Sequence, residues 1–137
     1  MRVIVCGGRD CHEADVFNWL EQYAAAELGE RITMVIHGGA SGADTGGLKW
    51  AVSEDGCSSR CFEANWRKHG KAAGPIRNQQ MIDEGRPDAV IAFPGGRGTA
   101  DMVRRAEAAG LRIVRATLPA HGLKAAADAS GNVQERK

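Results

Sequence analysis

Three apolar runs that each end in a glycine pair constrain the fold of this chain most strongly. The runs occupy residues 2–6, 32–36 and 89–93, and the glycine pairs follow at residues 7–8, 38–39 and 95–96. An apolar run of this length is typical of a strand buried on both faces, and glycine lets the backbone turn sharply where the strand ends. The pattern predicts buried parallel strands with tight turns at their carboxyl ends.

Stretches with helical spacing of apolar residues separate these runs. The expected helices cover residues 13–28, 44–52, 73–84 and 99–109, and weaker strands are expected at 60–64 and 113–116. Alternation of strands and helices predicts an α/β fold with a doubly wound, mostly parallel sheet of about five strands and helices on both faces. Ligands of such sheets bind in a crevice at the carboxyl ends of the strands, where the three glycine-rich turns converge.

Length and composition indicate one globular domain at residues 1–118, followed by a polar, partly disordered extension at residues 119–137 with a short helical turn at residues 124–127. With 18 basic and 17 acidic residues, the net charge is +1. This balance argues against an electrostatic nucleic-acid binder. No apolar stretch is long enough to span a membrane, so we expect no membrane association.

The four cysteines indicate a reduced compartment. The first strand starts at the amino terminus without a signal peptide, so we expect a cytoplasmic protein with free thiols. A zinc site built from Cys11, His12, Cys57 and Cys61 is the alternative, but the sequence has no CxxC spacing. We therefore expect no metal.

The segment from Pro94 to Thr99 is the most informative one, because it joins a predicted strand to a predicted helix. Its glycines allow close approach to an anion, and the helix that follows presents free N–H groups to phosphate. Thr99 caps the helix or bonds a phosphate oxygen. The alternative is a plain tight turn. The segment is neither a P-loop nor a GxGxxG dinucleotide motif.

Three other segments supply candidate binding groups. Arg9 could bind phosphate through two N–H groups of its planar guanidinium, or form a salt bridge with Asp10 or Asp15. Asp44 either faces the ligand or simply suits the start of its helix. The basic segment 66–78 contains Trp66, which could stack on a base. The alternative for that segment is a solvated loop with Trp66 as its apolar anchor.

These segments together resemble the SMF/DprA–LOG (SLOG) superfamily of Rossmann-like proteins, and most closely its YspA-type branch. The resemblance rests on GGRD at 7–10, HGGASGAD at 37–44, WA at 50–51, ANW at 64–66, GKAAGPIRN at 70–78 and FPGGRGT at 93–99. It implies a Rossmann-like nucleotide-binding domain that forms a homodimer or higher homo-oligomer. A small nucleotide derivative is the expected partner, with no required cofactor.

The resemblance also extends to the LOG branch, whose members hydrolyse the N-glycosidic bond of nucleoside monophosphates. That branch implies a phosphate-holding role for Arg77, but its motif glutamate falls on Met102 here. Asp101 is the adjacent carboxylate and lies about 100° around the helix. Arg77 and Asp101 are therefore the candidate catalytic pair. The DprA branch binds single-stranded DNA, and its Arg-Asn dipeptide resembles Arg77 and Asn78.

Three functions follow from the sequence. Binding or sensing of a nucleotide-derived, phosphate-bearing ligand ranks first, an N-glycosidase acting on nucleoside monophosphates second, and single-stranded nucleic-acid binding through Trp66, Lys68 and Lys71 third. The candidate ligand-binding residues are Gly7, Gly8, Arg9, Gly38, Gly39, Ala40, Gly42, Ala43, Asp44, Trp66, Asn78, Pro94, Gly95, Gly96, Arg97, Gly98 and Thr99.

Overall fold

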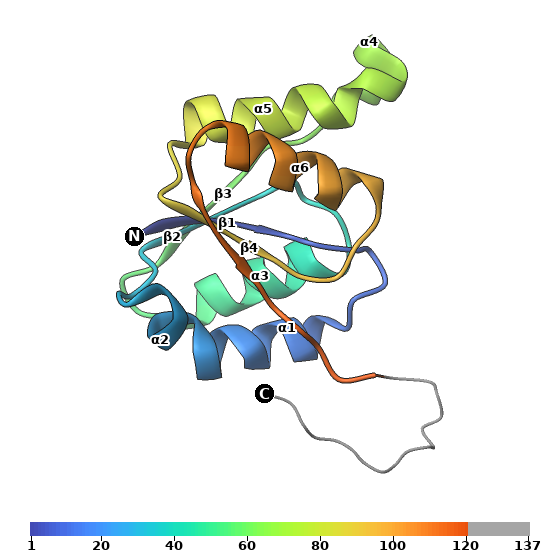
Figure 1. Cartoon of the computed structure of the whole chain (residues 1–137). Helices are drawn as coiled ribbons and strands as arrows, with labels where there is room; N and C mark the ends of the chain where they lie inside the picture. Colours follow the sequence, from blue (N-terminus) through green and yellow to red (C-terminus); the bar gives the residue numbers. More distant parts are fainter. Residues whose placement is uncertain (121–137) are drawn as a thin grey trace.

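A five-stranded, all-parallel sheet forms the centre of the protein (Figure 1). The computed structural model describes residues 1–120. The strands are β1 (Arg2–Cys6), β2 (Met34–His37), β3 (Ser58–Cys61), β4 (Ala89–Ala92) and β5 (Arg112–Arg115). Their order in the sheet is β3-β2-β1-β4-β5, so the direction of winding reverses between β1 and β4. The predicted α/β, Rossmann-like fold is confirmed, and a crevice is expected at this reversal.

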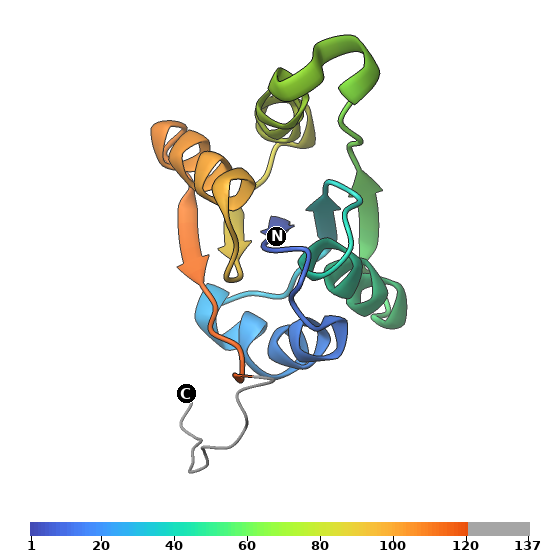
Figure 2. The ribbon, with the colours of Figure 1, turned by 90° about the vertical axis from the view of Figure 1, so that its right-hand side faces the viewer.

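Helices cover both faces of the sheet, as Figure 2 shows. One face carries α1 (Glu13–Trp19), a π-helical segment (Leu20–Ala24), α2 (Ala25–Leu28) and α3 (Ala43–Ser53). The other carries α5 (Ala73–Gly85) and α6 (Arg97–Ala108). The short α4 (Trp66–His69) and a 3-10 turn (Gly70–Ala72) precede α5.

Side chains that alternate along β1 build two separate hydrophobic cores. Val3 and Val5 pack with Val16 of α1, whereas Ile4 packs with Met81 of α5 on the opposite face. Successive side chains of a strand point to opposite faces of its sheet, so an unbroken apolar run is what a strand with helices on both sides requires.

Several element boundaries differ from the sequence prediction. The helix predicted from residue 99 begins at Arg97 with Gly96 as its N-cap, so Thr99 lies in the first turn and is not the cap. All of the basic segment before α5, residues 66–72, is helical rather than a loop. β3 lies at Ser58–Cys61, two to three residues before its predicted place, because pairing with β2 sets its position while its own residues are all exposed.

The predicted carboxyl-terminal extension begins at residue 119, and its residues 121–137, including the expected turn at 124–127, lie outside the described residues. Within residues 1–120, every helix is too short or too polar to cross a membrane.

Candidate functional site

The three glycine-rich turns meet at the carboxyl ends of β1, β2 and β4, as their spacing predicted. The backbone N–H of Gly8 donates to the carbonyl of Pro94 at 2.8 Å, and the N–H of Ala43 donates to the carbonyl of Gly8 at 3.2 Å. A methyl group on Gly42 would collide with the carbonyl oxygens of Gly8 and Arg9. The turns are therefore joined to each other through their main chains.

A cavity of about 510 Å³ opens beside these turns, between the edge of the sheet and helices α5 and α6. Twelve of the predicted ligand-binding residues line it: Gly7, Gly8, Arg9, Gly38, Ala40, Asp44, Trp66, Asn78, Gly96, Arg97, Gly98 and Thr99. Both predicted catalytic residues, Arg77 and Asp101, line it as well. The predicted residues that do not line it are Gly39, Gly42, Ala43, Pro94 and Gly95.

Positive charge dominates the walls of this cavity. Its five cationic side chains are those of Arg9, Lys71, Arg77, Arg97 and Arg104, and its two carboxylates are those of Asp44 and Asp101. The salt bridges between residues 1–120 include none from Arg9. The charge balance favours an anionic ligand.

The first turn of α6 presents backbone N–H groups to this cavity. Gly96 is its N-cap, no side chain caps the turn, and no acidic residue lies within it. A methyl group on Gly96 or Gly98 would meet no atom within 4 Å. The amides at this helix end are thus open to an anion, which the helix dipole also attracts.

The guanidinium of Arg77 lies against the floor of the cavity. Its Nη1 donates to the carbonyl oxygens of Gly38 at 2.9 Å and Phe62 at 3.2 Å, and its Nε donates to Oδ1 of Asn78 at 3.1 Å. These bonds fix the plane of the guanidinium, and its Nη2 makes no hydrogen bond to any of residues 1–120. Arg77 is therefore held rigidly by protein groups and keeps Nη2 to donate hydrogen bonds to an anion.

Asp44 organises the turn after β2 rather than merely suiting the start of α3. It is 7% exposed, and its Oδ2 accepts hydrogen bonds from the N–H groups of Gly38 at 2.9 Å and Ala40 at 3.3 Å. Burial raises the pKa of Asp44, and those N–H groups together with His37 and Arg77 oppose the rise. Because the carboxylate takes both amides, this turn has little capacity left for phosphate.

His37 is a buried polar residue that the sequence analysis missed. Its Nδ1 accepts a hydrogen bond from the N–H of Gly39 at 3.1 Å, and burial lowers the pKa of the imidazole. The side chain is thus held neutral beneath the turn that Asp44 organises. Its position at the end of an apolar run gave no signal beyond that of a core residue.

The register of α6 brings Asp101, not residue 102, to the polar side of the helix. Met102 is buried in the core with Ile4 and Met81. The carboxylate of Asp101 accepts hydrogen bonds from Nε of Arg105 at 2.8 Å and Nδ2 of Asn78 at 3.0 Å. Partial burial raises the pKa of Asp101, but these two bonds together with the positive charges of Arg105 and Arg104 outweigh it, so the net shift is downward and the group is ionised at neutral pH.

Trp66 lies at the rim of the cavity and is 53% exposed. The alternative interpretation required Trp66 to be an apolar anchor for its segment, and the exposure of the ring does not support that role. Its ring lies over Gly74, where an added methyl group would be 3.4 Å from Cη2 of the indole. A half-exposed aromatic ring beside a cationic cavity suits stacking on a planar group.

Lys71 and Arg104 line the cavity although the sequence analysis did not select them as ligand-binding residues. Arg104 had a usable signal, because it lies three residues after Asp101 and seven after Arg97, on one face of the helix. Lys71 was a candidate only for nucleic-acid binding, and its place at this cavity depends on how α4 and the 3-10 turn pack on α5.

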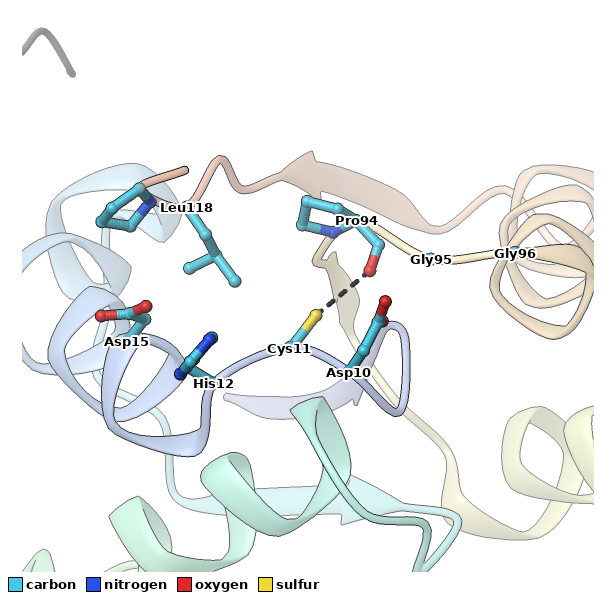
Figure 3. A pocket seen from close by; sticks show the side chains of 9 residues that line it. Asp10, Cys11, His12, Asp15, Pro94, Gly95, Gly96 and Leu118 are labelled. Atoms are coloured by element: carbon cyan, nitrogen blue, oxygen red, sulfur yellow. Dashed lines mark hydrogen bonds between the residues drawn. The ribbon is translucent and has the colours of Figure 1, made fainter. Parts of the chain in front are cut away.

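A second cavity, of about 450 Å³, lies on the other side of the turn after β4 (Figure 3). Pro94 and Gly95 line it, together with the acidic residues Asp10 and Asp15. Cys11 donates to the carbonyl of Pro94 at 3.2 Å, and burial raises the pKa of its thiol, so it is not an activated nucleophile. The acidic lining does not suit an anionic ligand.

The cysteines do not gather into a metal site in the part of the chain that the structure describes. All four are free, and residues 1–120 contain no group of three or more histidine, cysteine, aspartate or glutamate side chains placed to hold a metal ion.

Comparison with known proteins identifies the family. The profile of the YspA, cpYpsA-related SLOG family matches residues 1–69. The chain belongs to this SLOG family. The gene 61 protein of Mycobacterium phage D29 is 39% identical to it over 87 residues, an alignment that covers 59% of this chain and 69% of the phage protein. SLOG membership is in keeping with a nucleotide-related ligand in general. The family match covers the turns after β1 and β2, whereas α5 and α6 lie beyond residue 69.

Proposed function

We propose that this SLOG protein binds a nucleotide-derived, phosphate-bearing ligand in the cavity between the sheet edge and helices α5 and α6. The observation that carries the proposal is the charge of the cavity: five cationic side chains and the open amides of α6 face it, against two carboxylates that already have partners. A cavity of about 510 Å³ falls within the usual range of small-molecule sites.

The walls offer a distinct place for each part of a nucleotide. The first turn of α6, with Arg97, suits the phosphate. Trp66 at the rim suits the base. Oδ1 of Asp44 accepts neither of the backbone N–H bonds that Oδ2 receives, so it is left to accept from a ribose hydroxyl.

Replacing Arg97 by alanine is expected to weaken binding of the tightest nucleotide about tenfold or more, because a charge-assisted hydrogen bond to phosphate contributes about 1.5–3 kcal/mol. Arg67→Ala is the matched control, since Arg67 is an exposed arginine of α4 that does not line the cavity. Isothermal titration calorimetry with AMP, ADP, ADP-ribose, NAD and a cyclic dinucleotide measures both variants.

Adenosine and a single-stranded oligonucleotide complete the panel. Adenosine should bind much more weakly than AMP. A nucleic-acid site would instead give oligonucleotide binding that falls steeply with salt. If no nucleotide gives saturable heat at about 1 mM, a dissociation constant that corresponds to a binding free energy of about −4 kcal/mol, the proposal is wrong.

Ultracentrifugation of the same samples measures the self-association that the family resemblance implies.

Hydrolysis of the N-glycosidic bond is a second candidate function, favoured by the placement of Asp101. The carboxylate lines the same cavity as Arg77 and is ionised, so it can stabilise positive charge that develops at the anomeric carbon. Its low pKa makes it a poor general base, which limits its role to electrostatic stabilisation.

This candidate predicts that the wild-type protein releases free base from AMP and that Asp101→Asn, which removes the electrostatic stabilisation, reduces the rate about 100-fold or more. Chromatographic detection of adenine measures the rate. Asp83→Asn is the control, because Asp83 lies on α5 outside the cavity. Wild-type protein that binds AMP without releasing adenine would leave a binding domain and exclude the hydrolase.

A further inference from the structure

We propose that Asn78 is a positioning residue whose side-chain amide holds Arg77, the first turn of α6 and Asp101 in one arrangement, so that all three act on the same ligand. The inference rests on the proposed function for its consequence in binding, and on the hydrogen bonds of Asn78 alone for the arrangement itself.

The amide of Asn78 is buried, and both its oxygen and its nitrogen are hydrogen-bonded to protein groups. The residue is 5% exposed. Its Oδ1 accepts from Nε of Arg77 at 3.1 Å, and its Nδ2 donates to the carbonyl of Gly98 at 3.2 Å and to Oδ2 of Asp101 at 3.0 Å. Three groups from two helices are thus tied to one side chain. Although the sequence analysis took Asn78 for a ligand contact, its hydrogen bonds suit a supporting role.

The chemistry of the three partners fixes the orientation of this amide. Arg77 can only donate, whereas the carbonyl of Gly98 and the carboxylate of Asp101 can only accept. A reversed amide would set an oxygen against both acceptors and an NH₂ group against a donor. Asparagine at this position therefore specifies how α5 and α6 lie relative to each other at the cavity.

The hydrogen bonds of Asn78 connect the two groups that can donate hydrogen bonds to an anion in the cavity, Arg77 and the first turn of α6. Gly98 belongs to the turn whose amides face the ligand, and Arg77 reaches the floor from the other helix. A phosphate that contacts both must find them at a fixed separation, and binding sites lose affinity when such groups are free to move. Asn78 supplies that constraint through its own hydrogen bonds.

The isosteric substitution Asn78→Asp tests the linkage. Oδ1 can still accept a hydrogen bond from Arg77. An ionised carboxylate at residue 78, however, cannot donate to the carbonyl of Gly98. It also replaces the 3.0 Å hydrogen bond to Asp101 by a repulsive contact between two carboxylates. Two carboxylates at this distance share a proton as the pH falls, and the shared proton restores a donor. The charged groups around the pair are Arg77 of α5, Arg104 and Arg105 of α6, and Asp44 of α3 beyond Arg77.

Two measurements on this variant are expected to change together. Amide hydrogen exchange of residues 100–102, which follow the linked turn, should accelerate about tenfold at about pH 7.5, and AMP affinity should fall about tenfold or more. Both should return toward the wild-type values as the pH is lowered, because a proton shared between the two carboxylates restores a donor. A residue that only stabilises the fold would not give AMP binding this pH dependence.

Gln80→Glu is the matched control, since it makes the same amide-to-carboxylate change on α5 away from the cavity lining. If Asn78→Asp does not fold, the exchanged pair Asn78→Asp with Asp101→Asn restores one amide–carboxylate bond and should recover part of the exchange protection. Unchanged exchange in Asn78→Asp, or a failure of the exchanged pair to recover protection, overturns the proposal. So does accelerated exchange with unchanged AMP affinity. If wild-type protein does not bind AMP, the proposed function fails for that ligand and hydrogen exchange alone decides the linkage.

Discussion

Replacing Gly42 by alanine is expected to lower the free energy of unfolding by about 3–5 kcal/mol. Gly42 has φ 80° and ψ −122°, a conformation essentially restricted to glycine, which costs another residue about 1–3 kcal/mol. The added methyl group would also collide with the carbonyl oxygens of Gly8 and Arg9, and such overpacking costs about 1–3 kcal/mol more. Main-chain oxygens cannot rotate away as a side chain can. Urea denaturation followed by circular dichroism measures the loss.

Gly98→Ala is the matched control for this prediction. Residue 98 lies in the first turn of α6, and its added methyl group meets no atom within 4 Å. Because alanine favours a helix over glycine by up to about 1 kcal/mol, this variant should be as stable as the wild type or more so. A loss of less than about 1 kcal/mol in Gly42→Ala would show that the turns after β1 and β2 do not pack as the structure has them.

Replacing Arg77 by alanine is expected to remove ligand binding and to cost about 3 kcal/mol of unfolding free energy. The substitution leaves the carbonyls of Gly38 and Phe62 and the amide of Asn78 without their donor, and hydrogen bonds to charged groups contribute about 1.5–3 kcal/mol each. It also removes the cation that lowers the pKa of Asp44.

The unfolding free energy lost in Arg77→Ala should depend on pH, and the titration of Asp44 decides whether the loss is larger at neutral or at acidic pH. Burial already raises the folded-state pKa of this carboxyl above its value in the unfolded chain, and loss of Arg77 raises it further. Between the unfolded and folded pKa values, the folded state binds more protons than the unfolded state, so stability falls as pH rises. Arg77→Ala should therefore lose more stability relative to wild type at neutral pH than at acidic pH.

Arg77→Lys separates charge from geometry in this experiment. Lysine keeps a cation near Asp44 but cannot form the three bonds of the planar guanidinium, so the pH dependence should shrink while ligand affinity stays low. Arg67→Ala, on the exposed side of α4, is the control. Equal nucleotide affinity in Arg77→Ala and wild type, measured by calorimetry, would remove Arg77 from the site.

The buried strands were predictable because their residues carry the signal themselves. β4 is apolar throughout and β1 is apolar from Val3 to Cys6, as a strand covered on both faces must be. β3 has no such signal: Ser58, Ser59 and Arg60 are exposed, and pairing with β2 decides where the strand lies. Its predicted position was therefore displaced.

The glycines show why the site was only partly predictable. A glycine that lets a ligand approach and one that lets another turn approach have the same appearance in a sequence. Gly7 and Gly42 serve the packing of the turns, whereas Gly96 and Gly98 face open space. Similarly, the place of Asp101 depended on the start of α6, which Gly96 rather than Thr99 determines.

The meeting of the three turns through main-chain groups has a consequence for how this site can change. The frame of the cavity depends on hydrogen bonds such as Gly8 to Pro94 and Ala43 to Gly8, which involve no side-chain atoms. The outer wall consists of long side chains from other elements, including Trp66, Lys71 and Arg104. Frame and wall are separable parts, so ligand preference can be redesigned at the wall positions without remodelling the sheet that supports them.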